Sequence, residues 1–162
     1  MSGTPGDRRA SAAIDHARRT GRPELDLSGL GLTAPPEEVG RLTGLRRLSL
    51  SKNQLTAIPA WIGRRTSLHG LDLSGNRLTE LPPELGRLTQ LRTLTLAANL
   101  LTGLPADLGR LTRLQRLDLE VNPLAEPLAG LAAQGHDAML AYLERLRKAA
   151  GDRPAGPRPG AA

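Results

Sequence analysis

Leucines and small polar residues alternate along most of the chain in a pattern that repeats every 23 residues. Each copy opens like LDLS at 71–74, which places two leucines on one face of a short strand and two polar residues on the other. An asparagine and a Leu-Pro step then end the strand and turn the chain. The complete copies are residues 25–47, 48–70, 71–93 and 94–116, and a fifth opens at 117 and stops midway.

The second half of each copy, of the form PELGRLTQL, spaces its apolar residues as a helical or 3₁₀ turn would. Because every copy has the same length, successive strands must lie parallel and in register. One copy alone buries too few leucines to offset the entropy of ordering its backbone, so the copies must stack in order to fold. The pattern therefore predicts a stacked array of strands and short turns over residues 22–128.

Stacking exposes a leucine layer at each end of the array, and two amphipathic segments are placed to cover these layers. Before the array, apolar residues at helical spacing are Ala10, Ala13, Ile14 and Ala17. After it, beyond Gly135, they are Met139, Tyr142, Leu143 and Leu146. The sequence predicts cap helices over 8–21 and 129–149, and disordered segments over 1–7 and 150–162.

These copies resemble leucine-rich repeats of the LxxLxLxxNxLxxLPxxLGxLTxL type, similar to those of Ras-group scaffolds and of bacterial Roco-type GTPases. The resemblance implies an α/β fold: a right-handed solenoid with a parallel concave sheet of about five strands, here with helical caps at both ends. It also implies a ladder of asparagines, whose side-chain amides form hydrogen bonds with the backbone of the turns in neighbouring repeats. The ladder residues would be Asn53, Asn76, Asn99 and Asn122. The first repeat departs from the pattern, since Leu30 replaces its ladder asparagine.

The amino-acid composition limits the cellular compartment and the kinds of functional site that we expect. The chain of 162 residues has no cysteine, which excludes disulfide scaffolds, thiolate zinc sites and cysteine nucleophiles. No apolar stretch is long enough for a signal peptide or a membrane span. We therefore expect a cytoplasmic protein that does not associate with membranes.

Residues that could support catalysis are scattered. Neither lysine follows a glycine, so the phosphate-binding loop of a GTPase is missing. The histidines, His16, His69 and His136, fall in the first cap, a repeat and the second cap, where they cannot converge on a metal. His69 could act as a base, but no nucleophile stands beside it. We therefore expect no enzyme activity, no metal and no cofactor.

The polar strand positions form columns on the concave face, which is small, polar and mildly acidic along its middle. By analogy with the similar families, we expect a monomeric scaffold that binds a protein partner here, such as a GTPase or a signalling enzyme. The candidate concave residues are Asp26, Arg47, Ser49, Lys52, Asp72, Thr95, Arg116, Asp118 and Glu120.

The convex side carries a column of arginines: Arg41, Arg64, Arg87 and Arg110. Acidic residues stand three positions earlier in three of the repeats, at Glu38, Glu84 and Asp107, and are expected to pair with these arginines. The second repeat instead has Trp61 at the acidic position and Arg65 at a leucine position. Trp61, Arg64 and Arg65 form either a partner contact or a local repair in which Trp61 covers the Arg65 stem.

The formal net charge of +6 favours an alternative function, the binding of anions or nucleic acid by the arginine-rich repeats. Nucleic-acid binding is disfavoured because lysines and stacking aromatics are scarce: the chain has one tryptophan, one tyrosine and no phenylalanine.

Overall fold

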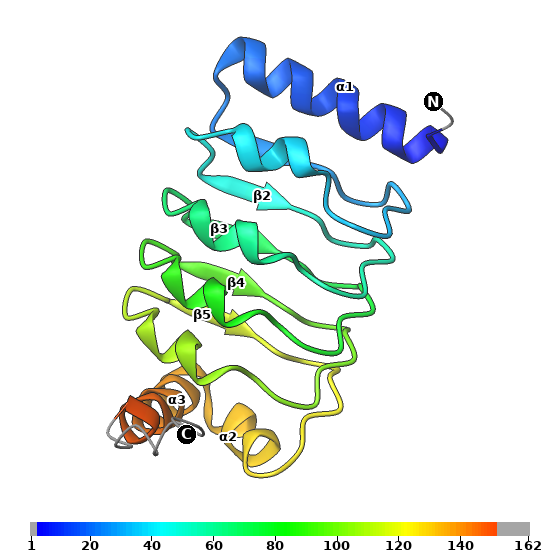
Figure 1. The fold of residues 1–162 in the computed structure, drawn as a ribbon. Coiled ribbons are helices and arrows are strands. Elements are labelled where there is room, and N and C mark those ends of the chain that lie inside the picture. The colour runs from blue at the N-terminus through cyan, green and yellow to red at the C-terminus, as the bar shows by residue number, and fades with distance from the viewer. Residues whose placement is uncertain (1–2, 152–162) are drawn as a thin grey trace, which may run out of the picture.

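Five short strands form one parallel sheet along one side of the molecule (Figure 1). A computed structural model describes residues 3–151. The strands are β1 (Glu24–Asp26), β2 (Arg47–Ser49), β3 (Gly70–Asp72), β4 (Thr93–Thr95) and β5 (Arg116–Asp118). Neighbours in the sheet are neighbours in sequence, and each residue pairs with the residue 23 positions later, as Leu48 does with Leu71. The prediction of a parallel sheet in register is confirmed.

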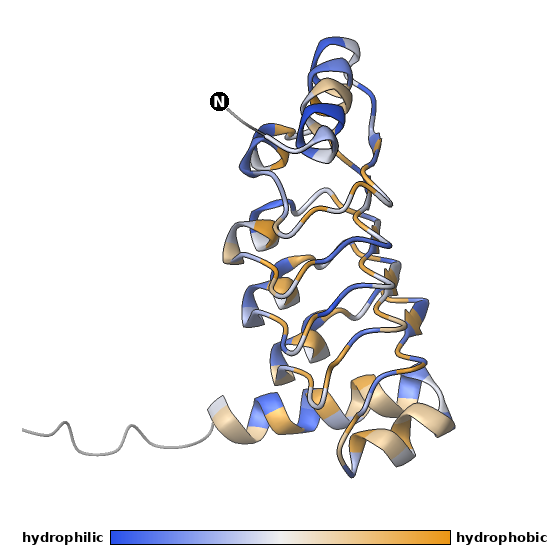
Figure 2. Cartoon of the chain, turned by 90° about the vertical axis from the view of Figure 1, so that its right-hand side faces the viewer, coloured by the Kyte–Doolittle hydropathy of each residue, from blue (hydrophilic) through white to orange (hydrophobic). Residues whose placement is uncertain are grey.

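Four 3₁₀ helices return the chain on the side opposite the sheet (Figure 1). They are η1 (Glu37–Arg41), η2 (Ala60–Arg64), η3 (Pro83–Arg87) and η4 (Ala106–Arg110). A proline with extended backbone stands directly before each 3₁₀ helix. The proline ring fixes φ at a value that suits the step from extended chain into the helix. Leucines of strand and return fill the space between the two sides; Leu73, Leu85 and Leu96 are fully buried. Figure 2 shows apolar and polar segments alternating along each turn of the array.

The repeated glycines of the returns allow the 3₁₀ helices to stack backbone on backbone. A Cβ added at Gly63 would collide with the carbonyl group of Glu84 in the next repeat, and one at Gly86 would collide with that of Asp107. At Gly109 a Cβ would strike the backbone of the C-terminal helix at Leu143 and Glu144. That helix therefore packs where the 3₁₀ helix of a further repeat would lie.

Buried asparagine side chains join successive repeats. The Nδ2 of Asn76 donates to the Leu50 carbonyl of the previous repeat and to the Leu73 carbonyl of its own, each at 3.0 Å. Its Oδ1 accepts from the Leu55 N–H at 3.0 Å. The same three kinds of bond recur at the other ladder positions, Asn53, Asn99 and Asn122. Each carboxamide thus satisfies turn groups in two repeats.

The N-terminal helix α1 (Pro5–Thr20) covers the first repeat with Ala10, Ile14 and Ala17, all buried. It begins earlier than the predicted residue 8, so the prediction of disorder is wrong for residues 5–7. The cause is a capping box: the Thr4 Oγ1 accepts from the Asp7 N–H at 3.1 Å, and the Asp7 carboxylate accepts from the Thr4 N–H at 2.8 Å.

Two helices close the C-terminal end where the sequence predicted one helix over 129–149. They are α2 (Leu128–Gln134) and α3 (His136–Gly151), separated by Gly135 with a φ of 107°. Met139 and Leu143 of α3 are fully buried, but Leu146 is 42% exposed, so the apolar stripe is narrower than predicted. Residues 150 and 151 continue α3, and the rest of the expected disordered tail, 152–162, lies outside the described residues.

No helix within residues 3–151 combines the length and the apolar character that crossing a membrane requires.

Candidate functional site

The concave face carries an open groove of about 860 Å³ that crosses the first four strands near their starts. Strand residues and the residues just before each strand line it together. The charged and polar residues among them are Arg22, Glu24, Asp26, Arg46, Arg47, Ser49, His69, Asp72, Arg92, Thr93, Thr95 and Gln115.

A basic row follows one edge of this groove. It consists of Arg22 and of the residues just before β2, β3 and β4, namely Arg46, His69 and Arg92. Backbone bonds hold the last three in register: the His69 N–H donates to the Arg46 carbonyl at 2.7 Å, and the Arg92 N–H donates to the His69 carbonyl at 2.8 Å. Within residues 3–151, no carboxylate forms an ion pair with Arg22, Arg46 or Arg92. The row therefore presents three exposed guanidinium groups without acidic partners.

The aspartates beside this row, Asp26, Asp72 and Asp118, accept hydrogen bonds from nearby backbone N–H groups. The Asp26 Oδ1 accepts from the Ser28 N–H at 2.9 Å, and the Asp72 Oδ1 accepts from the Ser74 N–H at 2.9 Å. Asp118 repeats this bond to the Glu120 N–H at 3.1 Å. These are Asx turns, which support the chain where each strand ends. Part of the acceptor capacity of each carboxylate is therefore used within the fold.

The structure separates the predicted concave residues into two groups. Asp26, Arg47, Ser49, Asp72 and Thr95 line the groove, and Arg47 pairs with Glu24 at 3.4 Å. The remaining predicted residues lie elsewhere: Arg116, Asp118 and Glu120 line a second groove, and Lys52 lines neither of the two.

The interpretation of the sequence missed the basic row, because it considered only columns inside the strands and their first flanking position. Arg46, His69, Arg92 and Gln115 occupy the same repeat position, one residue before the position that Arg47 and Arg116 hold in their repeats. Aligning that position down the repeats would have found them.

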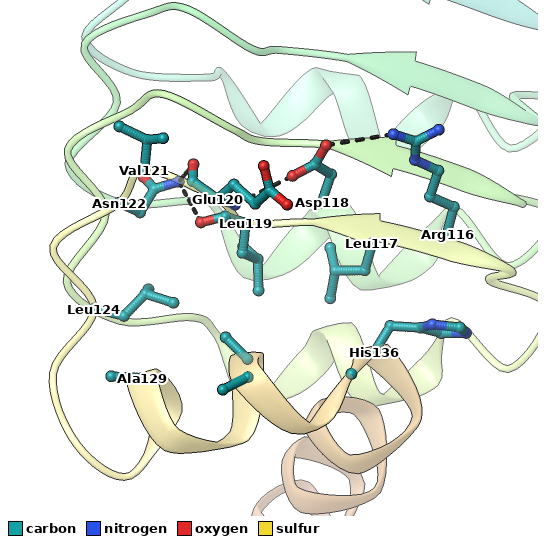
Figure 3. A pocket seen from close by; sticks show the side chains of 13 residues that line it. Arg116, Leu117, Asp118, Leu119, Glu120, Val121, Asn122, Leu124, Ala129 and His136 are labelled. Atoms are coloured by element: carbon teal, nitrogen blue, oxygen red, sulfur yellow. Dashed lines mark hydrogen bonds and ion pairs between the residues drawn. The ribbon is translucent and has the colours of Figure 1, made fainter.

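The second groove, of about 640 Å³, lies between β5 and α2 (Figure 3). Its apolar lining comes from Leu117, Leu119 and Leu124 on one side and from three alanines of α2, Ala129, Ala132 and Ala133, on the other. Arg116 and Asp118 form an ion pair at 3.6 Å on its sheet side. His136, at the start of α3, completes the lining.

The convex arginine column is less neutralised than the sequence predicted. Of the three expected pairs, only Asp107 and Arg110 form an ion pair in the described chain, at 3.5 Å. Arg41 and Arg87 are exposed and have no such partner within residues 3–151. An exposed ion pair contributes at most about 1 kcal/mol to stability. This is too little to hold two long side chains firmly in a paired geometry.

Trp61 lies between the first two repeats. Its half-buried ring packs beside Gly40, where an added Cβ would make an ordinary contact of 3.5 Å with the Trp61 Cε3. At the equivalent glycines, Gly63 and Gly86, the following backbone occupies this space. The ring therefore fills a gap between η1 and η2, which supports a repair by Trp61. Nearby, Arg65 keeps its Nε and Nη1 buried without a hydrogen-bond partner among the described residues.

We predict that Trp61→Glu, which restores the acidic residue of the other repeats, destabilises the protein by about 2–3 kcal/mol, because it removes an aromatic packing contact and opens a cavity. Urea unfolding followed by far-ultraviolet circular dichroism measures the change, since the variant lacks the only tryptophan. Arg64→Ala, an exposed neighbour, serves as the control. Unchanged stability of Trp61→Glu would favour a partner contact instead.

Among residues 3–151, no three histidines, aspartates or glutamates are grouped so that they could hold a metal ion. The Nδ1 of His69 lies 2.7 Å from the Ser67 carbonyl oxygen, so the backbone orients this ring at the groove.

A family model described as a leucine-rich repeat region matches residues 25–147, which is most of the chain. The chain belongs to the leucine-rich repeat family. No curated protein matches this leucine-rich repeat protein significantly. The family assignment agrees with the stacked fold and confirms the resemblance found in the sequence.

Solved leucine-rich repeat structures resemble the chain over part of its length. A leucine-rich repeat protein of Leptospira interrogans is 32% identical over 69% of this chain and 34% of its own, with a TM-score of 0.54. A chain of the BIR3–SERK2 complex of Arabidopsis thaliana is 38% identical over 62% of this chain and 56% of its own, with a TM-score of 0.57. The BIR2 ectodomain of the same plant is 28% identical over 64% of this chain and 70% of its own, with a TM-score of 0.56. This chain thus spans only about a third of the Leptospira protein.

Proposed function

We propose that this leucine-rich repeat protein is a non-catalytic scaffold that binds a protein partner on its concave face. The observation that carries the proposal is the basic row, in which three arginines without an ion-pair partner among residues 3–151 line an open groove. The BIR3–SERK2 complex supports the proposal in general terms, because it is an assembly of a related protein with another protein.

The chemistry of the groove indicates what the partner offers. Arg22, Arg46 and Arg92 are free to donate to carboxylates, and the planar guanidinium group binds a carboxylate through two parallel hydrogen bonds. The Asp26 and Asp72 carboxylates already accept hydrogen bonds from the Ser28 and Ser74 N–H groups, so they contribute less to binding a partner. We therefore infer a partner segment rich in aspartate and glutamate, carried by a GTPase or a signalling enzyme as the similar families suggest.

The proposal places the protein in the cytoplasm and includes no catalytic step. The absence of cysteine suits a reducing compartment. The similar structures do not decide the compartment, since one of them is an ectodomain.

The basic row would also suit phosphate groups, which keeps anion or nucleic-acid binding as the second candidate. No phenylalanine, tyrosine or tryptophan lines the groove in the described chain, so the groove lacks the large stacking surface that single-stranded nucleic acid prefers.

Affinity capture from the native lysate, at low and physiological salt and with and without nuclease, separates the two candidates. We expect a single protein to remain bound at physiological salt after nuclease treatment. Nucleic acid that is lost as the salt concentration rises would instead establish the second candidate.

A further inference from the structure

Backbone groups at the edge of the last strand have no partner among the residues that the structure describes. Just after each earlier strand, two N–H groups donate to the following repeat; Leu96 and Ala98 do so to the Asp118 and Glu120 carbonyls, both at 2.8 Å. The equivalent N–H groups of the fifth repeat, at Leu119 and Val121, have no hydrogen-bond partner within residues 3–151. An unpaired edge of this kind is a template for a further strand.

An acceptor is also free at the other end of this edge. The carbonyls before the earlier strands each accept two bonds from the next repeat, as the Arg92 carbonyl does from the N–H groups of Gln115 and Arg116. The Gln115 carbonyl accepts none from the described residues. The donors and this acceptor are arranged like those that bind each parallel strand to its neighbour.

The groove between β5 and α2 provides room for such a strand. Figure 3 shows Leu117 and Leu119 pointing toward α2, and Ala129 of α2 lines the same groove. α3 packs tightly on η4 at Gly109, whereas the α2 wall offers only the small side chains of its alanines. The C-terminal cap therefore packs mainly on the returns and less on β5, and it leaves a groove beside the strand in which Leu119 is already buried.

Val121 is a second unusual feature at this edge. It is 79% exposed and has a φ of 55°, in the left-handed region that a β-branched residue rarely adopts. The earlier repeats have Gly29, Lys52, Gly75 and Ala98 at this position, all with positive φ, so the left-handed turn is common to the repeats and only the β-branched side chain is particular to the fifth. A strained, exposed apolar residue is costly to a lone fold, and such residues gather at binding sites.

The acidic residues along the β5 edge favour particular side chains on an added strand. Glu120 is exposed and has no ion-pair partner among the described residues, and Asp118 lies beside it on the same face, paired with Arg116. Basic side chains on the same face of an adjacent strand would oppose both acids.

We propose that the β5 edge binds an extended segment of a partner protein as a sixth parallel strand, with apolar side chains in the groove and basic ones beside Asp118 and Glu120. The spacing of these backbone donors and of the acceptor suits a peptide backbone as the occupant. This site is separate from the concave groove, so the scaffold would have two docking surfaces of opposite preference.

The test uses a fluorescent peptide, acetyl-Thr-Leu-Lys-Leu-Lys-Gly-Asn-amide, titrated with the full chain and followed by fluorescence anisotropy. Glu120→Lys should weaken binding about tenfold or more and should favour a peptide whose lysines are replaced by glutamate. Ala133→Arg, on the exposed groove side of α2, should also weaken binding by narrowing the groove. Glu38→Lys, an exposed acid on η1 with the same charge change, should leave binding unchanged.

Backbone methylation of the peptide tests the strand geometry directly. N-methyl groups on alternate residues of one parity should abolish binding, and those of the other parity should preserve it, because only one edge of an added strand pairs with β5. Binding that is insensitive to parity, or reduced equally by Glu120→Lys and Glu38→Lys, would overturn the proposal. So would failure to bind, or self-association of the chain that Ala133→Arg disrupts without any peptide binding.

Discussion

Gly86→Ala is expected to destabilise the protein by about 2–3 kcal/mol, although alanine is the better helix former. A Cβ at this position would collide with the Asp107 carbonyl group, which is backbone and cannot rotate away. The variant must therefore separate η3 from η4 and loosen the leucine layer between them. The change is measured as the free energy of unfolding in urea.

Gly40→Ala is the matched control, because Gly40 and Gly86 occupy the same position of their repeats. A Cβ at Gly40 would meet only the edge of the Trp61 ring at 3.5 Å, an ordinary contact. Its unfolding free energy should stay within about 0.5 kcal/mol of that of the unmodified chain. Equal effects at the two glycines would contradict backbone stacking as the reason for this repeat position.

Asn76→Ala is expected to lower the free energy of unfolding by about 3 kcal/mol. The buried carboxamide bonds the Leu50 and Leu73 carbonyls and the Leu55 N–H, and its removal leaves groups in two repeats without this partner. Gln134→Ala removes an exposed amide whose weak bond to the Gly130 carbonyl is 3.4 Å long, and it should change stability by less than about 0.5 kcal/mol.

The same urea titration, followed by circular dichroism, measures both variants. If Asn76→Ala lowers the free energy of unfolding no more than Gln134→Ala does, water replaces the hydrogen bonds of the asparagine ladder with little loss of stability.

The stacking of the repeats could be predicted because a fixed period allows one register only. Leucines at equal spacing place Leu48, Leu71 and Leu94 on neighbouring strands, whatever the detailed geometry of the returns. The helical spacing of apolar residues predicted the helix at the N-terminus, but it did not include the capping box of Thr4 and Asp7, which sets the true start of α1.

Features that depend on distances between repeats could not be predicted in this way. Gly40 and Gly63 look alike in the sequence, yet one faces the Trp61 ring and the other the Glu84 backbone. Ion pairing is equally hard to predict, because Glu84 and Asp107 have the same spacing to an arginine and only Asp107 forms a pair in the described chain. The free edge of β5 was also hidden, since the sequence does not show that the C-terminal cap leaves it open.

Binding through the concave face is the central claim, and paired charge reversals test it most directly. The variant Arg46→Glu/Arg92→Glu alters the basic row, and Arg41→Glu/Arg87→Glu makes the same change of net charge with exposed convex residues. Each is immobilised beside the unmodified chain, and the proteins captured from nuclease-treated lysate at physiological salt are quantified by mass spectrometry. We predict that the captured partner is lost from the concave variant and retained by the convex one. Equal retention by both variants, or loss from the convex variant alone, would contradict the claim.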